Sequence, residues 1–506
     1  MNRPQTREAL ASEIWRACNI LRRDNNCGGI MEYVQHLSWL LFLRFLDAQE
    51  EEWEAQATIA GRPYQRIIDP PYRWRDWAAK DWPAEDLLAF VRGKLIPYLQ
   101  TLGGEPLRET IRSIFAEHNV IVCASGYNLK DVITIINGID FHSQDDIFTV
   151  SQVYEELLRR LGNENRMAGE FYTPRPVVRF IVEVVNPQIG ETVYDPACGT
   201  CGFLAQAYLW MKEQEKTLED HRTLQERTFY GQEKKSIPAL LGLMNMVLHG
   251  VSAPQIRRRN TLEENIRQVS ERFDVVLTNP PFGGEEGPHI QANFPVKSSA
   301  TELLFLQHIM RKIKPRDGAR CGMVVPEGTL FRGGAFAEVK KALLEEFNLH
   351  TVVSLPPGTF APYSDVKTAL IFFERPGPTK EIWYYELPLP EGLKKFSKGS
   401  PIQDEHFEEA RRLWKAWDAY RKGQGPLEAC LSERSWIVPA DEGRDTACRV
   451  PTYDLTARNP NRQEAEALPS PVEIVAGLLE REREILSIVE ELDELLSNND
   501  REESGA

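Results

Sequence analysis

Short β-rich runs alternate with helical stretches between residues 165 and 385, and this alternation constrains the fold more than any other feature of the sequence. The predicted strands are 192–194, 228–230, 273–277, 321–325, 351–355 and 369–374. The predicted helices before and between them are 176–185, 204–216, 238–249, 302–313 and 335–347. Such alternation is typical of a mostly parallel sheet with helices on both faces. The sequence therefore predicts an α/β fold.

Further domains are expected on either side of this region, because 506 residues exceed what one ordinary core holds. Residues 1–150 carry apolar side chains at helical spacing and no catalytic constellation, which predicts a helical domain for packing or assembly. Within it, the proline-, arginine- and tryptophan-rich stretch 62–82 is predicted to be a loop or a hairpin. A catalytic domain is expected at 151–465, and a C-terminal helix at 466–506.

The C-terminal helix has an apolar seam with the spacing of a coiled coil. Its apolar positions follow alternating steps of three and four, and Glu482 is the one break. These positions are Val475, Leu478, Ile485, Val489, Leu492 and Leu496. A lone helix would leave the seam in water, so it needs a partner surface. That surface lies either on the same chain or, as we favour, on another subunit.

Composition limits the classes of protein that fit. The net charge of −15 argues against a chain that coats nucleic acid by charge alone, although it allows a local basic surface or a basic partner. Eight irregularly spaced cysteines do not form a disulfide framework, which favours a reduced, cytoplasmic setting. No signal peptide is recognisable, and the apolar run 39–43 is too short to span a bilayer. No membrane association is expected.

A glycine loop at 195–202 follows the first predicted strand and precedes a helix. Asp195 opens the loop, and Gly199 and Gly202 would let its backbone approach a ligand closely. The spacing is not G-x-G-x-x-G and there is no P-loop lysine, which disfavours a dinucleotide or a nucleoside triphosphate. An acidic residue at the start of the loop suits a ligand that carries an ammonium group.

Two cysteines, Cys198 and Cys201, form a C-x-x-C pair within the glycine loop. Such a pair can be a redox couple or half of a zinc site. No second pair and no paired histidines accompany it, and a tight loop also needs small side chains. We therefore predict no metal site.

Three other positions are candidates for the same ligand. Glu233 ends the second predicted strand, where an acid in nucleotide-binding folds takes ribose hydroxyls. Asn260 follows three arginines near the expected end of a third strand, and its amide could read an adenine edge. The arginines are either a solvated face or a phosphate contact. Upstream, Thr173 is a plausible N-cap and Pro174 a first-turn residue of a helix whose start could cover the ligand.

The proline corner, TNPPFGG at 278–284, follows the third predicted strand and makes a stiff turn at its end. An exocyclic amine on a base is a poor nucleophile, because its lone pair is delocalised. Two acceptors that hold both N–H hydrogens draw that nitrogen toward a reactive, tetrahedral form. The Asn279 side-chain oxygen and the Pro280 carbonyl are such acceptors, and Phe282 offers a flat face for stacking.

These stretches resemble class I S-adenosylmethionine-dependent methyltransferases that modify amino nitrogens, with the Asn-Pro-Pro-aromatic signature of N6-adenine DNA methyltransferases. The order of motifs is that of the gamma arrangement. Most of the chain is similar to the modification subunit of type I restriction–modification systems. The similarity rests on GEFYTPRPVVRFIV (169–182), DPACGTCGFL (195–204), NPPFGG (279–284), ATELLFLQHIM (300–310), GMVVPEGTLFRGG (322–334) and TALIFFER (368–375). It implies a Rossmann-like methyltransferase domain between the helical domain and the coiled-coil-like helix.

The resemblance also implies roles for individual residues. The expected catalytic residues, which would grip the target adenine, are Asn279, Pro280, Pro281 and Phe282. The expected binding residues for S-adenosylmethionine are Glu170, Phe171, Tyr172, Thr173, Pro174, Arg175, Asp195, Pro196, Cys198, Gly199, Thr200, Cys201, Gly202, Glu233 and Asn260. Cys201 departs from the family, which usually has glycine or alanine at this position.

The implied partners are double-stranded DNA, a separate specificity subunit, a second modification subunit and, where one is present, a restriction subunit. The target base would have to be flipped from the duplex, which costs a few kcal/mol. Two alternatives remain open from the sequence. One is a protein-glutamine methyltransferase, whose amide-nitrogen chemistry also suits the proline corner. The other is a catalytically silent assembly subunit.

Overall fold

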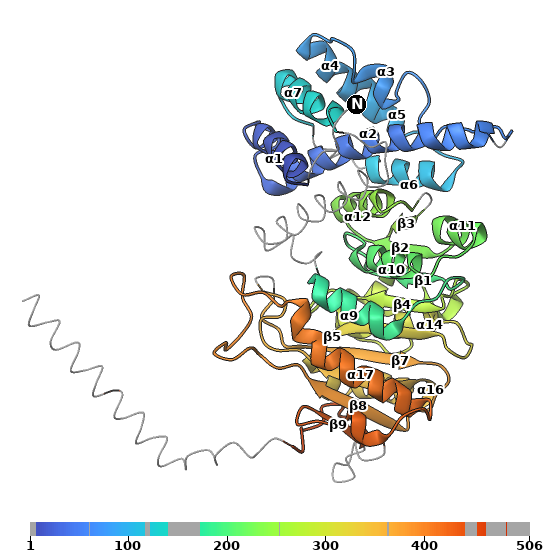
Figure 1. Cartoon of the computed structure of the whole chain (residues 1–506), viewed down its shortest axis with the longest axis vertical. Helices are drawn as coiled ribbons and strands as arrows, with labels where there is room; N and C mark the ends of the chain where they lie inside the picture. The colour runs from blue at the N-terminus through green and yellow to red at the C-terminus, as the bar shows by residue number, and fades with distance from the viewer. Residues whose placement is uncertain are drawn as a thin grey trace, which may run out of the picture. The chain divides into compact units, whose positions relative to one another are not determined.

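A single mixed sheet runs through the catalytic part of the chain in the computed structural model (Figure 1). The structure describes residues 7–59, 61–116, 122–139, 173–251, 254–361, 364–440, 453–461 and 482. Residues 1–458 form one compact unit and residues 459–506 form another. The predicted seam at 475–496 lies outside the described residues except for Glu482, which is helical. In the ranges that are described, no helix combines the length and apolar character needed to cross a membrane.

The N-terminal region is helical, as predicted. Its elements are α1 (Arg7–Arg22), α2 (Ile30–Ile59), α3 (Trp74–Trp77), α4 (Ala84–Phe90), a π-helical turn (Val91–Leu95), α5 (Ile96–Leu99), α6 (Pro106–Phe115) and α7 (Gly126–Asn137). Helix α2 provides the centre of the core, where Leu37, Leu40, Leu41 and Phe45 are at most 1% exposed. The stretch predicted as loop or hairpin is a loop with one short helix, α3.

The hydrophobic core of this region continues into the catalytic domain. It includes six residues of α12 (Ser236–Leu248), namely Leu240, Leu241, Leu243, Met244, Val247 and Leu248. Helix α12 lies against α2, so the N-terminal helices pack directly on an element of the catalytic domain. One face of α12 thus packs in the core of the helical domain, and its other face is free to pack within the catalytic domain.

Within the described ranges, the sheet has nine strands in the order β3-β2-β1-β4-β5-β7-β6-β8-β9. Their bounds are β1 (Val193–Asp195), β2 (Phe229–Glu233), β3 (Gln255–Arg258), β4 (Val275–Thr278), β5 (Arg320–Pro326), β6 (Asn348–Ser354), β7 (Thr368–Glu374), β8 (Glu381–Glu386) and β9 (Ser435–Pro439). The first five strands in this order pair in parallel. Strand β7 is antiparallel to β5 and β6, β6 pairs in parallel with β8, and β8 is antiparallel to β9.

The α/β prediction is therefore confirmed, and all six predicted strands are present with shifted ends. Strands β8 and β9 were not predicted, and β3 was expected only through its end near Asn260, without bounds. Strand β3 has a single buried residue, Ile256, among polar neighbours, so its apolar signal is weak. Strand β8, with the sequence EIWYYE, and β9 lie in a proline-punctuated region where no alternation with helices marks them.

Helices cover both faces of the sheet (Figure 1). On one face, α9 (Arg175–Val185), α10 (Gly202–Lys212) and α17 (Glu408–Arg421) share a core with inward-facing strand residues such as Val193 and Leu277. On the other face, α14 (Thr301–Lys312) and α16 (Ala335–Glu346) pack on Tyr194 and Val276. Neighbouring strand residues thus point into opposite cores, as the pleat requires.

The predicted cap of α9 is wrong by one residue. The N-cap position is Pro174 and not Thr173, and the first-turn proline is Pro176. A proline side chain offers no oxygen to the first-turn amides, and none caps them. The Thr173 hydroxyl is instead used in a contact with the proline corner, described below.

Candidate active site

Asp195 ends β1 and opens the glycine loop. The side chain is 1% exposed, and its Oδ1 accepts hydrogen bonds from Thr278 Oγ1 at 2.6 Å and Ala197 N at 3.0 Å. Burial raises the pKa of Asp195 to about 7, although these two hydrogen bonds lower it. An ammonium group next to this carboxylate would favour its ionised form. Thr278 lies directly before Asn279, so one hydroxyl connects the glycine loop to the proline corner.

The glycine loop turns sharply before α10. Gly199 (φ +50°) and Cys201 (φ +58°) both have left-handed backbone conformations, and Cys201 is the N-cap residue of α10. Cys201 N donates to Cys198 O at 2.6 Å, which closes the turn. Glycine adopts this conformation without strain, whereas a side chain costs about 1–2 kcal/mol there. The departure at Cys201 therefore carries a conformational cost.

Groups beneath the glycine loop hold its backbone in place. Asn245 Nδ2 of α12 donates to Thr200 O at 2.9 Å, and Gly199 N donates to Glu233 Oε2 at 3.1 Å. Helix α12 also approaches very closely at Gly242, where an added Cβ would lie 2.7 Å from Cys201 Sγ and 2.8 Å from Gly199 O. The face of α12 opposite the N-terminal helices thus forms the floor of the loop.

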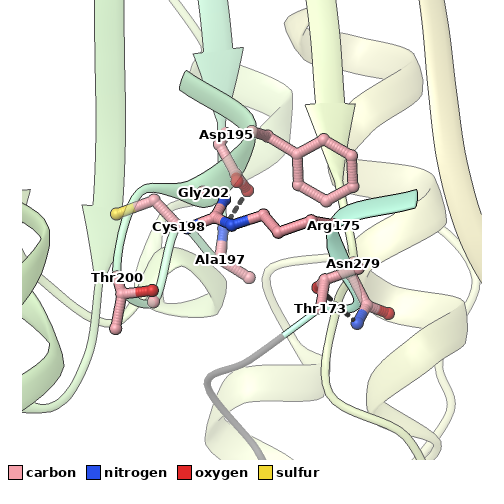
Figure 2. Close-up of a pocket in the computed structure, with 10 residues that line it drawn as sticks. Thr173, Arg175, Asp195, Ala197, Cys198, Thr200, Gly202 and Asn279 are labelled. Atoms are coloured by element: carbon pink, nitrogen blue, oxygen red, sulfur yellow. Dashed lines mark hydrogen bonds between the residues drawn. The ribbon is translucent and has the colours of Figure 1, made fainter. Parts of the chain in front are cut away.

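A pocket opens between the glycine loop, the start of α9 and the end of β4 (Figure 2). Its lining residues are Thr173, Arg175, Asp195, Ala197, Cys198, Gly199, Thr200, Gly202, Phe203 and Asn279. Eight of these ten were predicted from the sequence. Ala197 and Phe203 were missed, although both lie next to predicted residues in the chain. Loop residues with ordinary small or apolar side chains give no chemical signal of their own.

The Arg175 side chain reaches over the loop toward Gly202 (Figure 2). A Cβ added at Gly202 would lie 2.5 Å from Arg175 Nη1, so the missing side chain makes room for the guanidinium. Arg175 is the first residue of α9, and the chain just before it, including Thr173, also lines the pocket. The predicted residues Glu170, Phe171 and Tyr172 lie outside the described residues.

The remaining predicted binding residues do not line the pocket. Pro196 is buried, and its carbonyl accepts from Thr261 Oγ1 at 2.6 Å. Pro174 caps α9, and Cys201 is buried beneath the loop. Asn260 caps the short 3-10 helix Thr261–Glu263, since its Oδ1 accepts from Leu262 N at 3.2 Å.

Glu233 is buried at the end of β2, and burial raises the pKa of its carboxyl group. Its Oε1 accepts from Lys235 N at 2.8 Å, and its Oε2 accepts from Gly199 N. Each carboxylate oxygen retains a further lone pair that could accept a hydrogen bond from a hydroxyl group. Glu233 thus both supports the loop and offers acceptors beside it.

The C-x-x-C thiols are buried, and both cysteines are free. A hydrogen bond with Cys201, together with burial, holds the pKa of the Cys198 thiol well above its ordinary value. Thiols that stay protonated in this way are poor nucleophiles and poor metal ligands. Across the residues described, no cluster of three His, Cys, Asp or Glu side chains is placed to hold a metal ion.

Asn279 follows β4 (Val275–Thr278) directly and projects into the pocket (Figure 2). Its Nδ2 donates to Thr173 Oγ1 at 2.9 Å, whereas its Oδ1 is buried and has no hydrogen-bond partner among the described residues. Leaving a buried acceptor unpaired costs about 1–3 kcal/mol. Among the described residues, this oxygen is therefore free to accept a hydrogen bond from a further donor.

The rest of the proline corner lies beside this oxygen. Pro280 is buried, Pro281 is exposed, and Phe282 is half-buried. The Phe282 ring meets Phe360 edge to face, with the ring centroids 6.0 Å apart and the planes at 89°. The pocket at the glycine loop is not lined by Pro280, Pro281 or Phe282. The corner therefore extends beyond that pocket.

Two family models match the chain. The N-6 DNA Methylase model matches residues 143–453, and the HsdM N-terminal domain model matches residues 10–136. Among curated relatives, the type I restriction enzyme EcoEI methylase subunit of Escherichia coli is 38% identical over 501 residues, which covers 96% of this chain and 98% of the relative. The EcoKI methylase subunit of Escherichia coli strain K12 is 31% identical over 80% of this chain and 76% of the relative.

Solved structures agree with these matches. A chain from a study of assembly and conformational transition in a type I R-M system is 81% identical, with a TM-score of 0.83, covering 98% of this chain and 99% of that one. A modification subunit of a putative type I restriction enzyme from Vibrio vulnificus YJ016 is 40% identical, with a TM-score of 0.80 and coverage of 91% and 98%. The chain therefore belongs to the N-6 DNA methylase family, as a methylase subunit of a type I restriction–modification system.

Proposed function

We propose that this subunit transfers the methyl group of S-adenosylmethionine to N6 of an adenine flipped out of duplex DNA. The observation that carries this proposal is Asn279 Oδ1, a buried acceptor without a partner in the described chain, on a residue that lines a pocket built from a glycine loop and an acid. An exocyclic amine supplies the donor that this oxygen lacks. The N-6 DNA methylase family match supports adenine N6 as the acceptor.

The residues that line the pocket, together with two that lie outside its lining, Glu233 and Asn260, fit S-adenosylmethionine. Asp195 would pair with the ammonium group of its methionine part, and the Arg175 guanidinium would meet the carboxylate. Glu233 would accept hydrogen bonds from the ribose hydroxyls, and Asn260 would lie near the adenine ring. The loop backbone, kept bare at Gly199 and Gly202, lets the ligand approach closely. When bound, S-adenosylmethionine supplies an electrophilic methyl group.

The proline corner would then prepare the acceptor. Asn279 Oδ1 and the Pro280 carbonyl would accept the two N6 hydrogens, which concentrates the nitrogen lone pair and aims it at the pocket. Phe282 would stack on the flipped base. A carboxamide takes up no proton, so after transfer the N6 proton would leave to solvent. Asn279 thus acts by hydrogen bonding and not as a general base.

We further propose that the subunit works in a complex of two modification subunits with one specificity subunit, joined by a restriction subunit where one is present. Membership of a type I system supports this assembly. It also accounts for an acidic chain that modifies DNA, because the specificity subunit would supply the sequence reading. Double-stranded DNA would be the substrate, in the cytoplasm.

Calorimetric titration with S-adenosylmethionine, followed by transfer of a tritiated methyl group to genomic DNA, tests the proposal. We expect binding by the purified chain, and N6-methyladenine as product when the specificity subunit is present. Methylation of protein in place of DNA would identify a glutamine methyltransferase. Absence of cofactor binding would identify a silent assembly subunit.

A further inference from the structure

Thr173 contacts the side chain on which the proposed chemistry depends. Its Oγ1 lies 2.9 Å from Asn279 Nδ2, and the two residues are 106 positions apart in the chain (Figure 2). The hydroxyl does not cap α9, because Pro174 is the N-cap residue and no side chain caps the helix. Thr173 therefore lines the pocket and also bonds the residue at the end of β4.

The orientation of the Asn279 amide decides whether it can hold an amine. The oxygen and nitrogen of a carboxamide are nearly the same size, so the two flipped orientations fill the same space. With Oδ1 toward the substrate, the amide accepts an N6 hydrogen. With Nδ2 toward the substrate, two sets of donors face each other. In the structure the Thr173 hydroxyl accepts from Nδ2, and this arrangement leaves Oδ1 without a partner among the described residues and open to an incoming amine.

We propose that Thr173 is a positioning residue for methyl transfer, which holds the Asn279 carboxamide with its oxygen toward the target amine. This inference rests on the proposed function and adds a role different from lining the cofactor pocket. Thr173 and Arg175 both line that pocket. Thr173 thus joins the segment that meets the cofactor to the side chain that meets the base.

Two substitutions separate the hydroxyl from the rest of the side chain. Thr173→Val keeps the shape and removes the hydrogen bond, whereas Thr173→Ser keeps the hydroxyl. We expect Thr173→Val to lower kcat at saturating cofactor by about tenfold or more, because the amide loses its orientation before each transfer. We expect Thr173→Ser to restore kcat to within about threefold of the wild-type value. For both variants, the calorimetric Kd for S-adenosylmethionine should stay within about threefold.

Thr228→Val is a matched control. The Thr228 hydroxyl is buried and donates to Thr223 O at 2.8 Å, directly before β2 and at the opposite end of the parallel strands from the pocket. This variant loses a threonine hydrogen bond of similar length, so it reports what such a loss does to folding alone. Thermal unfolding of all three variants, measured beside the transfer assay with the specificity subunit present, separates lost stability from lost orientation.

Other outcomes would overturn the inference. If Thr173→Val raised Kd and left kcat unchanged, Thr173 would be a cofactor contact only. If Thr173→Ser were as slow as Thr173→Val, the methyl group and not the hydroxyl would matter. An unchanged Thr173→Val enzyme would show that Asn279 needs no orienting partner. A wild-type complex that methylates no DNA would instead refute the proposed function, and the inference would fall with it.

Discussion

The glycine loop and the proline corner lie at the carboxyl ends of two neighbouring parallel strands, β1 and β4, but they are held in place by different means. The loop has backbone contacts on several sides: Asn245 holds the Thr200 carbonyl, Glu233 holds the Gly199 amide, and α12 closes the floor at Gly242. At the corner, the Asn279 side chain has one hydrogen bond, to Thr173, and its oxygen has no partner among the residues that the structure describes.

This difference separates binding from chemistry. The part of the cofactor site that the loop backbone forms is insensitive to most side-chain substitutions at the loop, because the amides and carbonyls remain, whereas Asp195 contributes its own carboxylate. A reaction that depends on one amide oxygen is lost when that atom is lost. We therefore expect substitutions at the corner to affect kcat, and substitutions that move the loop backbone to affect cofactor affinity.

The largest effect is expected for Asn279→Ala. Removing the free oxygen takes away an acceptor for the amine, so transfer should fall by at least about 10²–10³-fold, as for other single groups that stabilise a transition state. Because the glycine loop is untouched, the Kd for S-adenosylmethionine should change little. Tritium transfer and calorimetry on the same preparation check this. Loss of cofactor binding and transfer together would contradict the assigned role.

Gly242→Ala should instead weaken cofactor binding, because it acts on the glycine loop and not on Asn279. Its Cβ would lie 2.7 Å from Cys201 Sγ and 2.8 Å from Gly199 O, so the loop backbone must move. We expect cofactor affinity to fall about 10–100-fold and the free energy of unfolding to drop by about 1–3 kcal/mol, as in other overpacked cores. Gly93→Ala is the matched control, since a Cβ at that helical glycine meets nothing within 4 Å. Equal losses in both variants would refute the packing argument.

Cofactor affinity should depend on pH through Asp195. The carboxylate must be ionised to pair with an ammonium group, and burial raises its pKa to about 7 in the absence of ligand. Affinity should therefore be constant well above pH 7 and fall by up to about tenfold per unit below it. Thr278 lowers this pKa through its hydrogen bond, so Thr278→Val should move the midpoint to higher pH. Calorimetry from about pH 5.5 to about pH 8.5 measures the pH dependence of the Kd in the wild type and its midpoint in Thr278→Val. A Kd of the wild type that does not change with pH would count against the pairing.

The smallest effect is expected at Cys201. Cys201→Gly removes the left-handed strain of about 1–2 kcal/mol but also removes a buried thiol, so the net change in unfolding free energy should stay within about 1 kcal/mol. Cys201→Ala loses the thiol and keeps the strain. Thermal unfolding should therefore rank Cys201→Gly above Cys201→Ala. The reverse order would show that the alanine Cβ contacts and the lower entropy of the unfolded alanine variant outweigh the backbone strain.

The sequence was most informative where chemistry and strand ends coincide. Asp195, Gly199 and Asn279 could be predicted as neighbours, because an acid, a glycine and an Asn-Pro-Pro turn each follow a recognisable strand. The α/β class followed from the same alternation. The family resemblance was confirmed over nearly the whole chain.

The groups that support the site were not predictable in this way. Gly242 and Asn245 lie inside an apolar helix, and only the packed structure shows that they form the floor of the loop. Thr173 was predicted as an N-cap from local pattern alone, whereas its hydroxyl bonds a residue 106 positions away. Such long-range contacts leave no periodic or spacing signal. The roles assigned to the individual site residues stay predictions until the variants above are measured.

Helix α12 has a consequence for how freely the two parts of this chain can be exchanged between relatives. The two family models divide the chain between residues 136 and 143, which suggests interchangeable modules. However, eleven of the thirteen residues of α12 are buried, with one face in the N-terminal core and the other under the glycine loop. A chimera cut at that boundary would join two halves of a core that did not evolve together. Grafts that carry α12 with its own N-terminal helices should keep that core intact. Poorly matched contacts would then lie between α12 and the glycine loop.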